Sequence, residues 1–411
     1  MITCRSCGET SLKPIVSLGN IPLANALLTQ DELNQSEERF PLDLVFCSNC
    51  SLVQITETVP PEKLFREYFY FSSFSDTILK SAHEIATKMI ERQALDQNSL
   101  VVELASNDGY LLKNYINKRI PVLGVEPARN IAREAQKRGI PTINEFFSAE
   151  LAEQLRDRYQ PANIIHANNV MAHVANLHSM IRGIHALLKP DGVAVIENHY
   201  VKDLIDNVEF DSIYHEHLCY YSVTSFRNLF EQHGLRLVDV EHLPLHGGSL
   251  RAYFQRSDGP CSIVKEGAQR VSSLLEGEEQ SGITNFAFYK NFGEKVEFLR
   301  NELTALLEKI KKDGKHIAVY GASAKSTTLL NYFGINPETF DYVVDRSTVK
   351  QGHFTPGTHL LIRPTESLLE TQPDYVLISA WNFTEEILSQ QTEYRARGGK
   401  FIVPVPTLKV I

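Results

Sequence analysis

The stretch from Leu100 to Leu112 constrains the fold of this chain more than any other. Its first five residues, Leu-Val-Val-Glu-Leu, form a short apolar run rich in β-branched side chains, which predicts a buried strand. Small and turn-forming residues follow from Ala105 to Gly109, and Tyr110-Leu-Leu-Lys-Asn-Tyr then continues at helical spacing. A strand, a tight loop and a helix in this order predict the first unit of a doubly wound α/β sheet, which binds ligands at the carboxyl ends of its strands.

An acidic residue after the next strand indicates what this loop binds. Glu126 follows the apolar run Val122-Leu-Gly-Val, at a distance from the loop where a carboxylate accepts hydrogen bonds from a ribose diol. The loop reads Glu-x-Ala-x-Asn-x-Gly, whereas a dinucleotide site carries three glycines that let a pyrophosphate approach the backbone. An adenosyl group without phosphates does not need that approach. The sequence therefore favours S-adenosylmethionine (SAM) over NAD.

The same sheet continues along the chain. We expect a helix from Pro127 to Arg138, a short strand at 140–144, a strand at 163–168 and a further strand that ends near Glu197. Polar side chains at the carboxyl end of a strand line the ligand crevice, and Phe147 is placed to cover an adenine face. The predicted cofactor-binding residues are Ser73, Glu103, Ala105, Asn107, Asp108, Gly109, Tyr110, Glu126, Pro127, Phe147, Asn168 and Asn169.

Two CxxC pairs, Cys4 with Cys7 and Cys47 with Cys50, predict a metal site at the amino-terminal end. In a reducing compartment this pattern favours metal over disulfides. Four thiolates complete a tetrahedral zinc site and leave no position open for a substrate. We therefore predict a structural zinc that stabilises a segment of about 60 residues, which is too small to hold a good core.

Charge and length exclude several classes of protein. The net charge of −9 argues against a nucleic-acid footprint, which is usually basic. The 411 residues can hold two to three domains, and no apolar run is long enough to span a bilayer. The first residues, Met1-Ile-Thr-Cys, do not resemble a signal peptide, so we expect a cytoplasmic protein without a membrane partner.

An aromatic segment from Phe65 to Ser75 leads into the predicted sheet. Its phenylalanines, among them Phe74, are expected in the core. The hydroxyls of Tyr68 and Tyr70 could instead point into a cleft, and the sequence does not decide between the two tyrosines.

A second dense stretch, Asp211 to Tyr221, holds two histidines, a glutamate and three tyrosines. On a strand, His215 and His217 would share one face and could bind metal with Glu216. The same groups could form a general base with an orienting carboxylate, or a hydrogen-bonded surface strand. Titratable groups cluster at functional sites, so we favour the acid–base interpretation. Further on, the loop from His246 to Arg251 could close over a substrate or be a hairpin turn.

The carboxyl-terminal part predicts a second Rossmann-like unit at 316–328. After its strand, Gly321-Ala-Ser-Ala-Lys325 points small residues and a lysine at a helix amino terminus, which is an anion site. The glycines lack dinucleotide spacing, so we favour a nucleotide-diphosphate clamp over an NAD domain or a structural repeat without a site. Asp345 and Trp381 end two further strands at the same edge.

Several motifs occur together in one order: the two CxxC pairs, Glu103-Leu-Ala-Ser-Asn-Asp-Gly-Tyr, Asn168-Asn-Val-Met-Ala-His-Val, Tyr214-His-Glu-His-Leu and His246-Gly-Gly-Ser-Leu-Arg. Their combination resembles the SAM-dependent sugar C-methyltransferases, such as 3-C-methyltransferases that act on nucleotide-linked 4-keto deoxysugars. The resemblance covers essentially the whole chain. It implies a zinc-binding domain at 1–62, a SAM-dependent methyltransferase domain at 63–268 and a nucleotide-binding Rossmann-like domain at 269–411.

The resemblance also implies the roles of the site residues. His217 would be the base, with Glu216 and Tyr214 beside the sugar, His173 near the ketone, and either Tyr68 or Tyr70 on the sugar. The predicted substrate-binding residues are His246, Ser249, Arg251, Gly321, Ser323, Lys325, Asp345, Lys350, Trp381 and Asn382.

Together these expectations describe a SAM-dependent enzyme that methylates carbon in a nucleotide-linked, TDP-type keto sugar and acts as a monomer or weak homodimer. Three rivals stay open at this point. They are a methyltransferase of a polyketide or other small metabolite, an NAD-dependent oxidoreductase, and a zinc-bearing interaction module without SAM binding.

Overall fold

The computed structural model describes residues 2–260, 265–335 and 337–411, and within them the strands form three sheets. The middle sheet has the strand order β10-β11-β8-β7-β4-β5-β6. Its strands are β4 (Val101–Leu104), β5 (Val122–Val125), β6 (Thr142–Ile143), β7 (Ala162–Asn168), β8 (Leu188–His199), β10 (Leu235–Leu243) and β11 (Ser249–Arg256). The predicted strands are therefore confirmed, and the order reverses at β4, where a ligand crevice is expected.

Five strands of the middle sheet are parallel, and the hairpin β10–β11 continues the sheet antiparallel to β8. Its helices are α2 (Asp76–Arg92), α3 (Leu112–Ile116), α4 (Arg129–Lys137), α5 (Ala149–Arg158), α6 (Leu177–Leu187), α7 (Val201–Asp206) and α8 (Val223–Glu231). Helix α2 shows why these segments are helical. Ser75 caps it by accepting a hydrogen bond from the amide of Ile78, and its apolar side chains recur at helical spacing and are buried.

The carboxyl-terminal sheet has the order β14-β13-β12-β15-β16-β17 and is parallel except for its last strand. Its strands are β12 (Ile317–Tyr320), β13 (Val343–Val344), β14 (Ile362–Arg363), β15 (Tyr375–Ile378), β16 (Lys400–Val403) and β17 (Lys409–Val410). Helix α9 (Lys265–Ser281) follows the middle sheet in sequence and packs against β10 and α8 of that unit. The later helices are α10 (Phe292–Lys312), α11 (Ala324–Tyr332), α12 (Ser367–Thr371), α13 (Thr384–Gln390) and α14 (Thr392–Ala396). This sheet also reverses its order, at β12, as the prediction of a second Rossmann-like unit requires.

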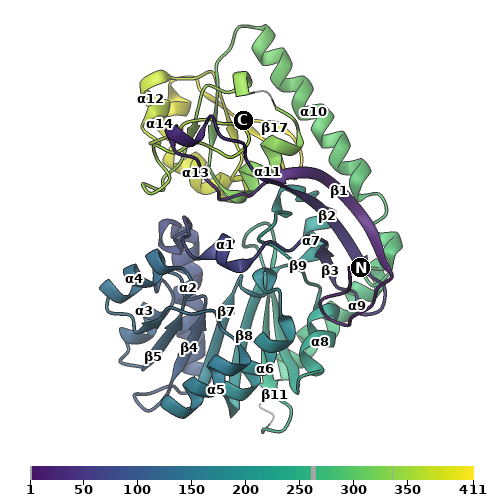
Figure 1. Ribbon diagram of the computed structural model, residues 1–411, viewed down its shortest axis with the longest axis vertical. Coiled ribbons are helices and arrows are strands. Elements are labelled where there is room, and N and C mark those ends of the chain that lie inside the picture. Colours follow the sequence, from purple (N-terminus) through teal and green to yellow (C-terminus); the bar gives the residue numbers. More distant parts are fainter. Residues whose placement is uncertain (1, 261–264, 336) are drawn as a thin grey trace.

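The amino-terminal sheet joins the other two units. It is antiparallel, with β1 (Leu12–Pro22), β2 (Arg39–Cys47), β3 (Val53–Ile55) and β9 (Cys219–Tyr220), so its last strand comes from the middle of the chain. Figure 1 shows the two α/β units one above the other, with β1 and β2 along their common side and α10 beside the upper unit. The short helix α1 (Pro61–Phe65) follows between the two units.

One hydrophobic core runs through all three units, with residues such as Phe46, Phe230 and Val319 in the same cluster. Short 3-10 helices complete the described elements: Gln30–Glu32, Ser72–Phe74, Met171–His173, Phe210–Ser212, Phe286–Phe288, Pro337–Thr339 and Trp381–Phe383. Within the described ranges, every helix is too short or too polar to cross a membrane.

One alternative left open by the sequence is excluded, and one local prediction is wrong. The segment 211–221 is no extended strand but a 3-10 turn, a loop and the two-residue strand β9, so His215 and His217 do not share a strand face. Phe74, expected in the core, is 38% exposed, because it sits in the short 3-10 turn before α2.

Candidate active site

A cavity of about 740 Å³ lies between the two α/β units. Its walls come from the aromatic lead-in segment, the carboxyl ends of β4, β5, β7 and β8, the tip of the β10–β11 hairpin, and the carboxyl ends of β12, β13 and β15. Strand ends from both sheets therefore meet in one chamber. Most of the residues predicted to bind ligands line it, namely Tyr68, Tyr70, Ala105, Asn107, Tyr110, Glu126, Pro127, Phe147, Asn168, Asn169, His173, Tyr214, His217, His246, Arg251, Gly321, Ser323, Lys325, Asp345, Lys350 and Asn382.

The loop after β4 and the carboxylate after β5 form one end of the cavity. Ala105 and Asn107 have φ of 47° and 50°, which brings the backbone of Asn107 to Glu126. The amides of Asn107 and Ala128 donate to the two oxygens of Glu126 over 2.8 and 2.9 Å. Gly109 is required here, because a Cβ atom at its φ of +78° would lie 2.5 Å from the side chain of Ile140.

Polar atoms without partners in this part of the structure face the same end. The Oδ1 atoms of Asn168 and Asn169 are buried and make no hydrogen bond. Buried polar groups are normally hydrogen-bonded, so these two oxygens are available to accept hydrogen bonds from a ligand. The donors of an adenosyl amino acid fit them, and its ribose fits Glu126. The predicted SAM site is thus compatible with the side chains present.

The structure places other predicted cofactor residues behind the wall. Asp108 is paired with the Arg138 guanidinium at 2.7 Å and accepts a hydrogen bond from Ser73. Glu103 is buried with one oxygen unpartnered, and burial together with the charges of Glu126 and Asp108 raises its pKa well above the ordinary value. Of these two predicted cofactor-binding carboxylates, Asp108 is thus neutralised by Arg138, and Glu103 is favoured in its neutral form.

His217 lies at the middle of the cavity with both ring nitrogens in contact with protein. The carbonyl of Ser212 lies 3.1 Å from Nδ1 and can only accept, so Nδ1 carries the proton. Nε2 is therefore the basic nitrogen, and it accepts a hydrogen bond from the Tyr214 hydroxyl over 2.7 Å. Burial and the neighbouring His173 keep the pKa of His217 well below its ordinary value, so the imidazole is neutral.

Glu216 stands behind the cavity wall and points at Tyr68. The Tyr68 hydroxyl donates to Oε2 of Glu216 over 2.7 Å, whereas Tyr70 is 37% exposed. The structure thus brings Tyr68, of the two candidate tyrosines, to the predicted acid–base cluster. His173 joins from another side, with its ring centroid 4.9 Å from that of His217.

His215 does not belong to this cluster. Its Nε2 lies 3.2 Å from the carbonyl oxygens of Phe40 and Pro41, so it ties the loop to strand β2. The metal interpretation of His215 and His217 fails because the two rings point to different neighbours.

His199 and Asn25 are among the polar cavity residues that the sequence analysis missed. His199 is the last residue of β8, and both of its ring nitrogens are buried without hydrogen-bond partners. The centroid of its ring lies 5.2 Å from the centroid of the His217 ring. The rule that polar residues end the strands at a crevice applies to it as well. Asn25, from the segment between β1 and β2, also lines the cavity, and nothing in its local sequence indicates this.

The carboxyl-terminal unit supplies the other end of the cavity. Ser323 caps helix α11 by accepting from the amide of Ser326, and Lys325 in its first turn is only 8% exposed. The Lys325 ammonium lies 4.3 Å from the centroid of the Trp381 ring, and Trp381 donates to Asp211 over 2.7 Å. Trp381 therefore supports Lys325 from behind and is not among the lining residues.

Asp345 and Lys350 shape the loop before α11. Asp345 accepts from the backbone amides of Ala322 and Ser347 over 2.7 and 2.8 Å, and Lys350 donates to the carbonyl of Ala322 over 2.7 Å. Arg346, exposed at the mouth between them, was not predicted from the sequence.

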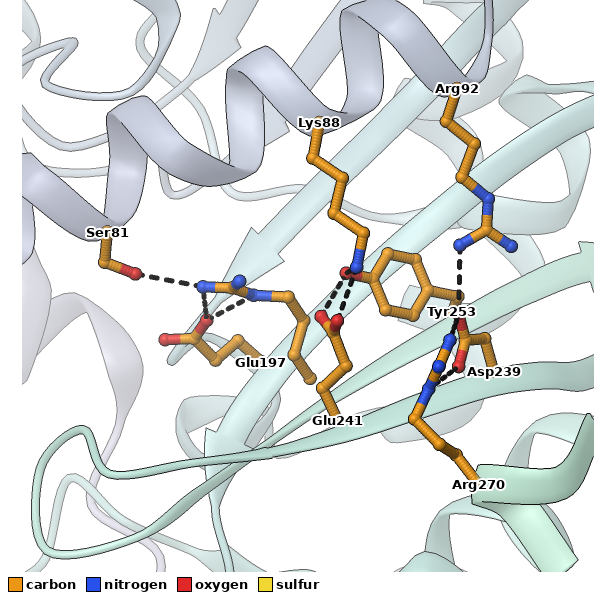
Figure 2. A network of polar contacts seen from close by, with 9 residues as sticks. Ser81, Lys88, Arg92, Glu197, Asp239, Glu241, Tyr253 and Arg270 are labelled. Atoms are coloured by element: carbon orange, nitrogen blue, oxygen red, sulfur yellow. Dashed lines mark hydrogen bonds and ion pairs between the residues drawn. The ribbon is translucent and has the colours of Figure 1, made fainter. Parts of the chain in front are cut away.

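The hairpin residues divide between the cavity and the sheet. His246 lines the cavity, but the Ser249 hydroxyl donates to the carbonyl of Leu245 and is buried in the hairpin. Arg251 is ion-paired with Glu197 at 2.7 Å and donates to Ser81 of α2. Three side chains of α2 hold this helix against the end of the sheet (Figure 2): Ser81 accepts a hydrogen bond from Arg251 of β11, and Lys88 and Arg92 donate to carboxylates of β10.

The four predicted zinc ligands gather at the amino-terminal sheet. The Sγ atoms of Cys4, Cys7, Cys47 and Cys50 all lie within 4.8 Å of one another, and three of the four residues are buried. This arrangement fits a tetrahedral zinc, and four sulfurs leave no coordination position for chemistry.

Comparisons with known proteins cover nearly the whole chain. Residues 244–406 match the family model described as "C-methyltransferase C-terminal domain", residues 4–65 the model "Putative zinc binding domain", and residues 78–240 the model "Methyltransferase domain". The chain is 36% identical over 408 residues to the C-methyltransferase NovU of Streptomyces niveus, an alignment that covers 99% of this chain and 96% of that relative.

Solved structures resemble part of the chain. The PH0226 protein of Pyrococcus horikoshii OT3 is 12% identical with a TM-score of 0.37, over 48% of this chain and 96% of that one. The magnesium protoporphyrin IX methyltransferase of Synechocystis PCC 6803, with bound SAM, is 10% identical with a TM-score of 0.33, over 43% of this chain and 79% of that one.

Proposed function

The chain belongs to the SAM-dependent C-methyltransferases, and from this premise we propose that it methylates C3 of a nucleotide-linked 4-keto deoxysugar. The observation that carries the proposal is the position of His217. His217 lines a cavity that has the strand ends of the middle sheet, with the predicted SAM site, on one side. The strand ends of the carboxyl-terminal sheet, with the predicted nucleotide site, lie on the other side. A substrate with a sugar joined to a nucleotide diphosphate suits such a two-ended chamber.

Proton removal is assigned to His217. A ketone acidifies the neighbouring C–H bond, and the neutral imidazole offers Nε2 as base while the Ser212 carbonyl holds Nδ1–H in place. When Nε2 takes the proton from C3, the hydrogen bond from Tyr214 must yield, so Tyr214 is free to donate elsewhere. SAM, when bound, supplies an electrophilic methyl group for the carbon that has lost its proton.

The enolate oxygen needs donors, since its charge must be held while the new bond forms. His173 and Tyr214 line the cavity beside His217 and carry such donors without a metal. Tyr68 lines the same cavity, and its hydroxyl donates to Glu216 behind the wall. We assign the ketone to this group of side chains.

The nucleotide diphosphate is assigned to the loop between β12 and α11. The amino terminus of α11, Lys325 and Lys350 place backbone amides and two ammonium groups at this end of the cavity. Burial lowers the pKa of Lys325, and the charges of Asp211 and Glu209 in the middle unit oppose part of that shift. We propose the corresponding division of labour as 1–62 for zinc, 63–268 for SAM and 269–411 for the nucleotide.

Calorimetric titration of the zinc-loaded protein with S-adenosylhomocysteine (SAH), and then with TDP and UDP, tests the proposal. Independent binding of SAH and one nucleotide is expected. Binding of SAH alone would contradict the nucleotide handle and favour a polyketide or other small metabolite. Binding of neither ligand would contradict the proposed site altogether.

A second measurement addresses the chemistry. In D₂O with SAH present, the enzyme should exchange the C3 proton of a TDP-4-keto-6-deoxyhexose, which mass spectrometry detects as a gain of one deuterium. Exchange at C5 alone, the carbon on the other side of the C4 ketone, would place the methyl group on C5 instead of C3.

A further inference from the structure

A segment of the zinc-bearing unit, residues 23–28, lies against the carboxyl-terminal unit and contributes Asn25 to the cavity wall. The carbonyl of Ala24 accepts a hydrogen bond from Thr327 of α11 over 2.9 Å. Leu28 and Phe354 exchange backbone hydrogen bonds of 2.8 and 3.0 Å in an isolated bridge. Both flanks of the segment are thus held by the carboxyl-terminal unit, and the residue between them has a fixed place.

That residue is Asn25, and its side chain reaches Glu216. The Asn25 Nδ2 atom donates to Oε1 of Glu216 over 2.7 Å, while the Tyr68 hydroxyl donates to Oε2 over 2.7 Å. A carboxylate oxygen only accepts, so the amide nitrogen must be the atom that faces Glu216. The two oxygens of Glu216, which is 2% exposed, therefore have different and fixed partners.

We infer that Asn25 is a positioning residue of the active site, which fixes the Glu216 carboxyl so that Oε2 faces the Tyr68 hydroxyl. The inference rests on the proposed function and extends it to a residue of the zinc-bearing unit. Asn25 acts through Glu216, and it keeps Oε1 from turning toward Tyr68. A proton shared by Glu216 and Tyr68 is then confined to Oε2, and the Tyr68 hydroxyl is aligned for the sugar.

The groups around Glu216 determine how a change at Asn25 alters the protonation of its carboxyl. Burial raises the pKa of Glu216, and the hydrogen bonds from Tyr68 and Asn25 and the ammonium of Lys350 oppose that rise. Burial raises the pKa of Tyr214 well above its ordinary value, and the charge of Glu216 raises it further. Removal of the Asn25 donor therefore favours the protonated form of Glu216.

Asn25→Asp, Asn25→Ala and the control Asn34→Asp test the inference in the full zinc-loaded chain. Asn34 belongs to the same unit but is exposed and does not line the cavity, so its change adds an equal charge without the contact. Turnover of the TDP-keto sugar is measured between pH 6 and pH 9, with SAH affinity and zinc content as checks on folding. Asn25→Asp and Asn25→Ala should lower kcat about 10-fold or more at pH 8, the effect of losing a hydrogen bond to a charged group, and should leave SAH affinity and zinc content unchanged.

The pH profile separates positioning from a loss of packing. In Asn25→Asp the new carboxyl regains a proton to donate at low pH, so its deficit should shrink toward pH 6, whereas the deficit of Asn25→Ala should not. Asn34→Asp should match the parent protein at every pH. Equal kcat values for the Asn25→Asp variant and the parent across this range would overturn the inference.

A substrate-free readout keeps the inference separate from the proposed function. In protein labelled with ¹³C at the glutamate carboxyls, the Glu216 signal is assigned by its absence in Glu216→Gln. Both Asn25 variants should raise the pH at which this signal titrates. An unchanged titration would overturn the inference even if the keto sugar proves to be the wrong substrate, while inactivity of the parent protein on that sugar would contradict only the proposed function.

Discussion

The Tyr214 hydroxyl donates a hydrogen bond to Nε2 of His217 across 2.7 Å, and the two rings lie 4.0 Å apart between centroids. Together with the Ser212 carbonyl at Nδ1, this contact fixes the tautomer and the orientation of the imidazole. The base nitrogen is thus presented to the cavity only after one hydrogen bond is exchanged. This relationship underlies the first prediction.

Replacement of His217 by asparagine should abolish proton removal. General-base catalysis contributes about 10²–10⁴-fold, so kcat and the rate of C3 deuterium exchange should both fall by at least about 100-fold. SAH affinity should stay within about threefold of the parent protein's, because the described contacts of His217 are with Ser212, Tyr214 and His173 rather than with Glu126. Full exchange activity in His217→Asn would show that another group is the base.

The lowered pKa of His217 sets the acid limb of the activity profile. A base whose pKa lies below the ordinary value stays unprotonated to a lower pH, so proton removal should persist below the ordinary range of histidine. The C3 exchange rate, measured from pH 5 to pH 8 with the protein checked for folding, should show no decline between pH 7 and pH 6.5. A decline with a midpoint near 6.5 would contradict the buried, neutral imidazole.

Affinity for SAH should depend on pH through Glu126. Burial raises the pKa of Glu126 to about 7, and only the ionised carboxylate accepts both hydrogen bonds of a ribose diol. Binding should therefore strengthen as pH rises through 7, by about 10-fold from pH 6 to pH 8 if one proton is lost. Calorimetry on Glu126→Gln should give weaker binding without this slope, while Glu153→Gln, at an exposed position, should behave like the parent.

The ion pair of Arg251 and Glu197 should be required for stability. Both side chains are largely buried, with 7% and 5% exposed, and removal of one partner leaves the other charge without compensation. Arg251→Met should lower the free energy of unfolding by about 3 kcal/mol, measured by urea denaturation. Arg397→Met, which breaks an exposed pair with Glu393, should cost less than about 1 kcal/mol. An equally small effect of Arg251→Met would contradict a stabilising role of the ion pair and leave substrate binding as the role of Arg251.

Loss of zinc should impair catalysis more than cofactor binding. Strand β3 pairs with β9, and the amide of Ile55 donates to the carbonyl of Leu218, the residue after His217. Chelation or Cys50→Ser should loosen this contact and raise hydrogen exchange at 53–55 and 218–220. It should also lower kcat at least 10-fold, which corresponds to an activation free energy higher by about 1.4 kcal/mol. SAH affinity should change less than threefold, on the order of 0.6 kcal/mol. Equal losses of both would indicate general unfolding instead.

The strands of the two α/β sheets were predictable because their signals are local, whereas the amino-terminal sheet was not predicted. The buried run before Ala105, the loop to Gly109 and the carboxylate of Glu126 lie close together in sequence, and β4, α3 and β5 follow from them. The cysteine cluster was predictable for the same reason, because each of the two short CxxC pairs supplies half of a zinc ligand set.

The segment 211–221 could not be predicted in this way. His215 and His217 are spaced as on one face of a strand, but the Ser212 carbonyl and the Tyr214 hydroxyl hold the His217 ring in place through its two nitrogens. Its neighbours come from far away in sequence, including the carbonyl of Phe40 on His215. Local periodicity carries no information about such partners.

The sequence by itself determined the class of fold, the zinc cluster and the chemical types present at the two strand edges, since each depends on side-chain patterns within a few tens of residues. Only the tertiary structure decided which side chains meet. Asn25 and Glu216 are separated by 191 residues, and Tyr68 and Glu216 by 148, yet both contacts measure 2.7 Å. Such pairs form because the amino-terminal sheet takes β9 from the middle unit, so the packing of whole units, rather than any local propensity, brings the active-site residues together.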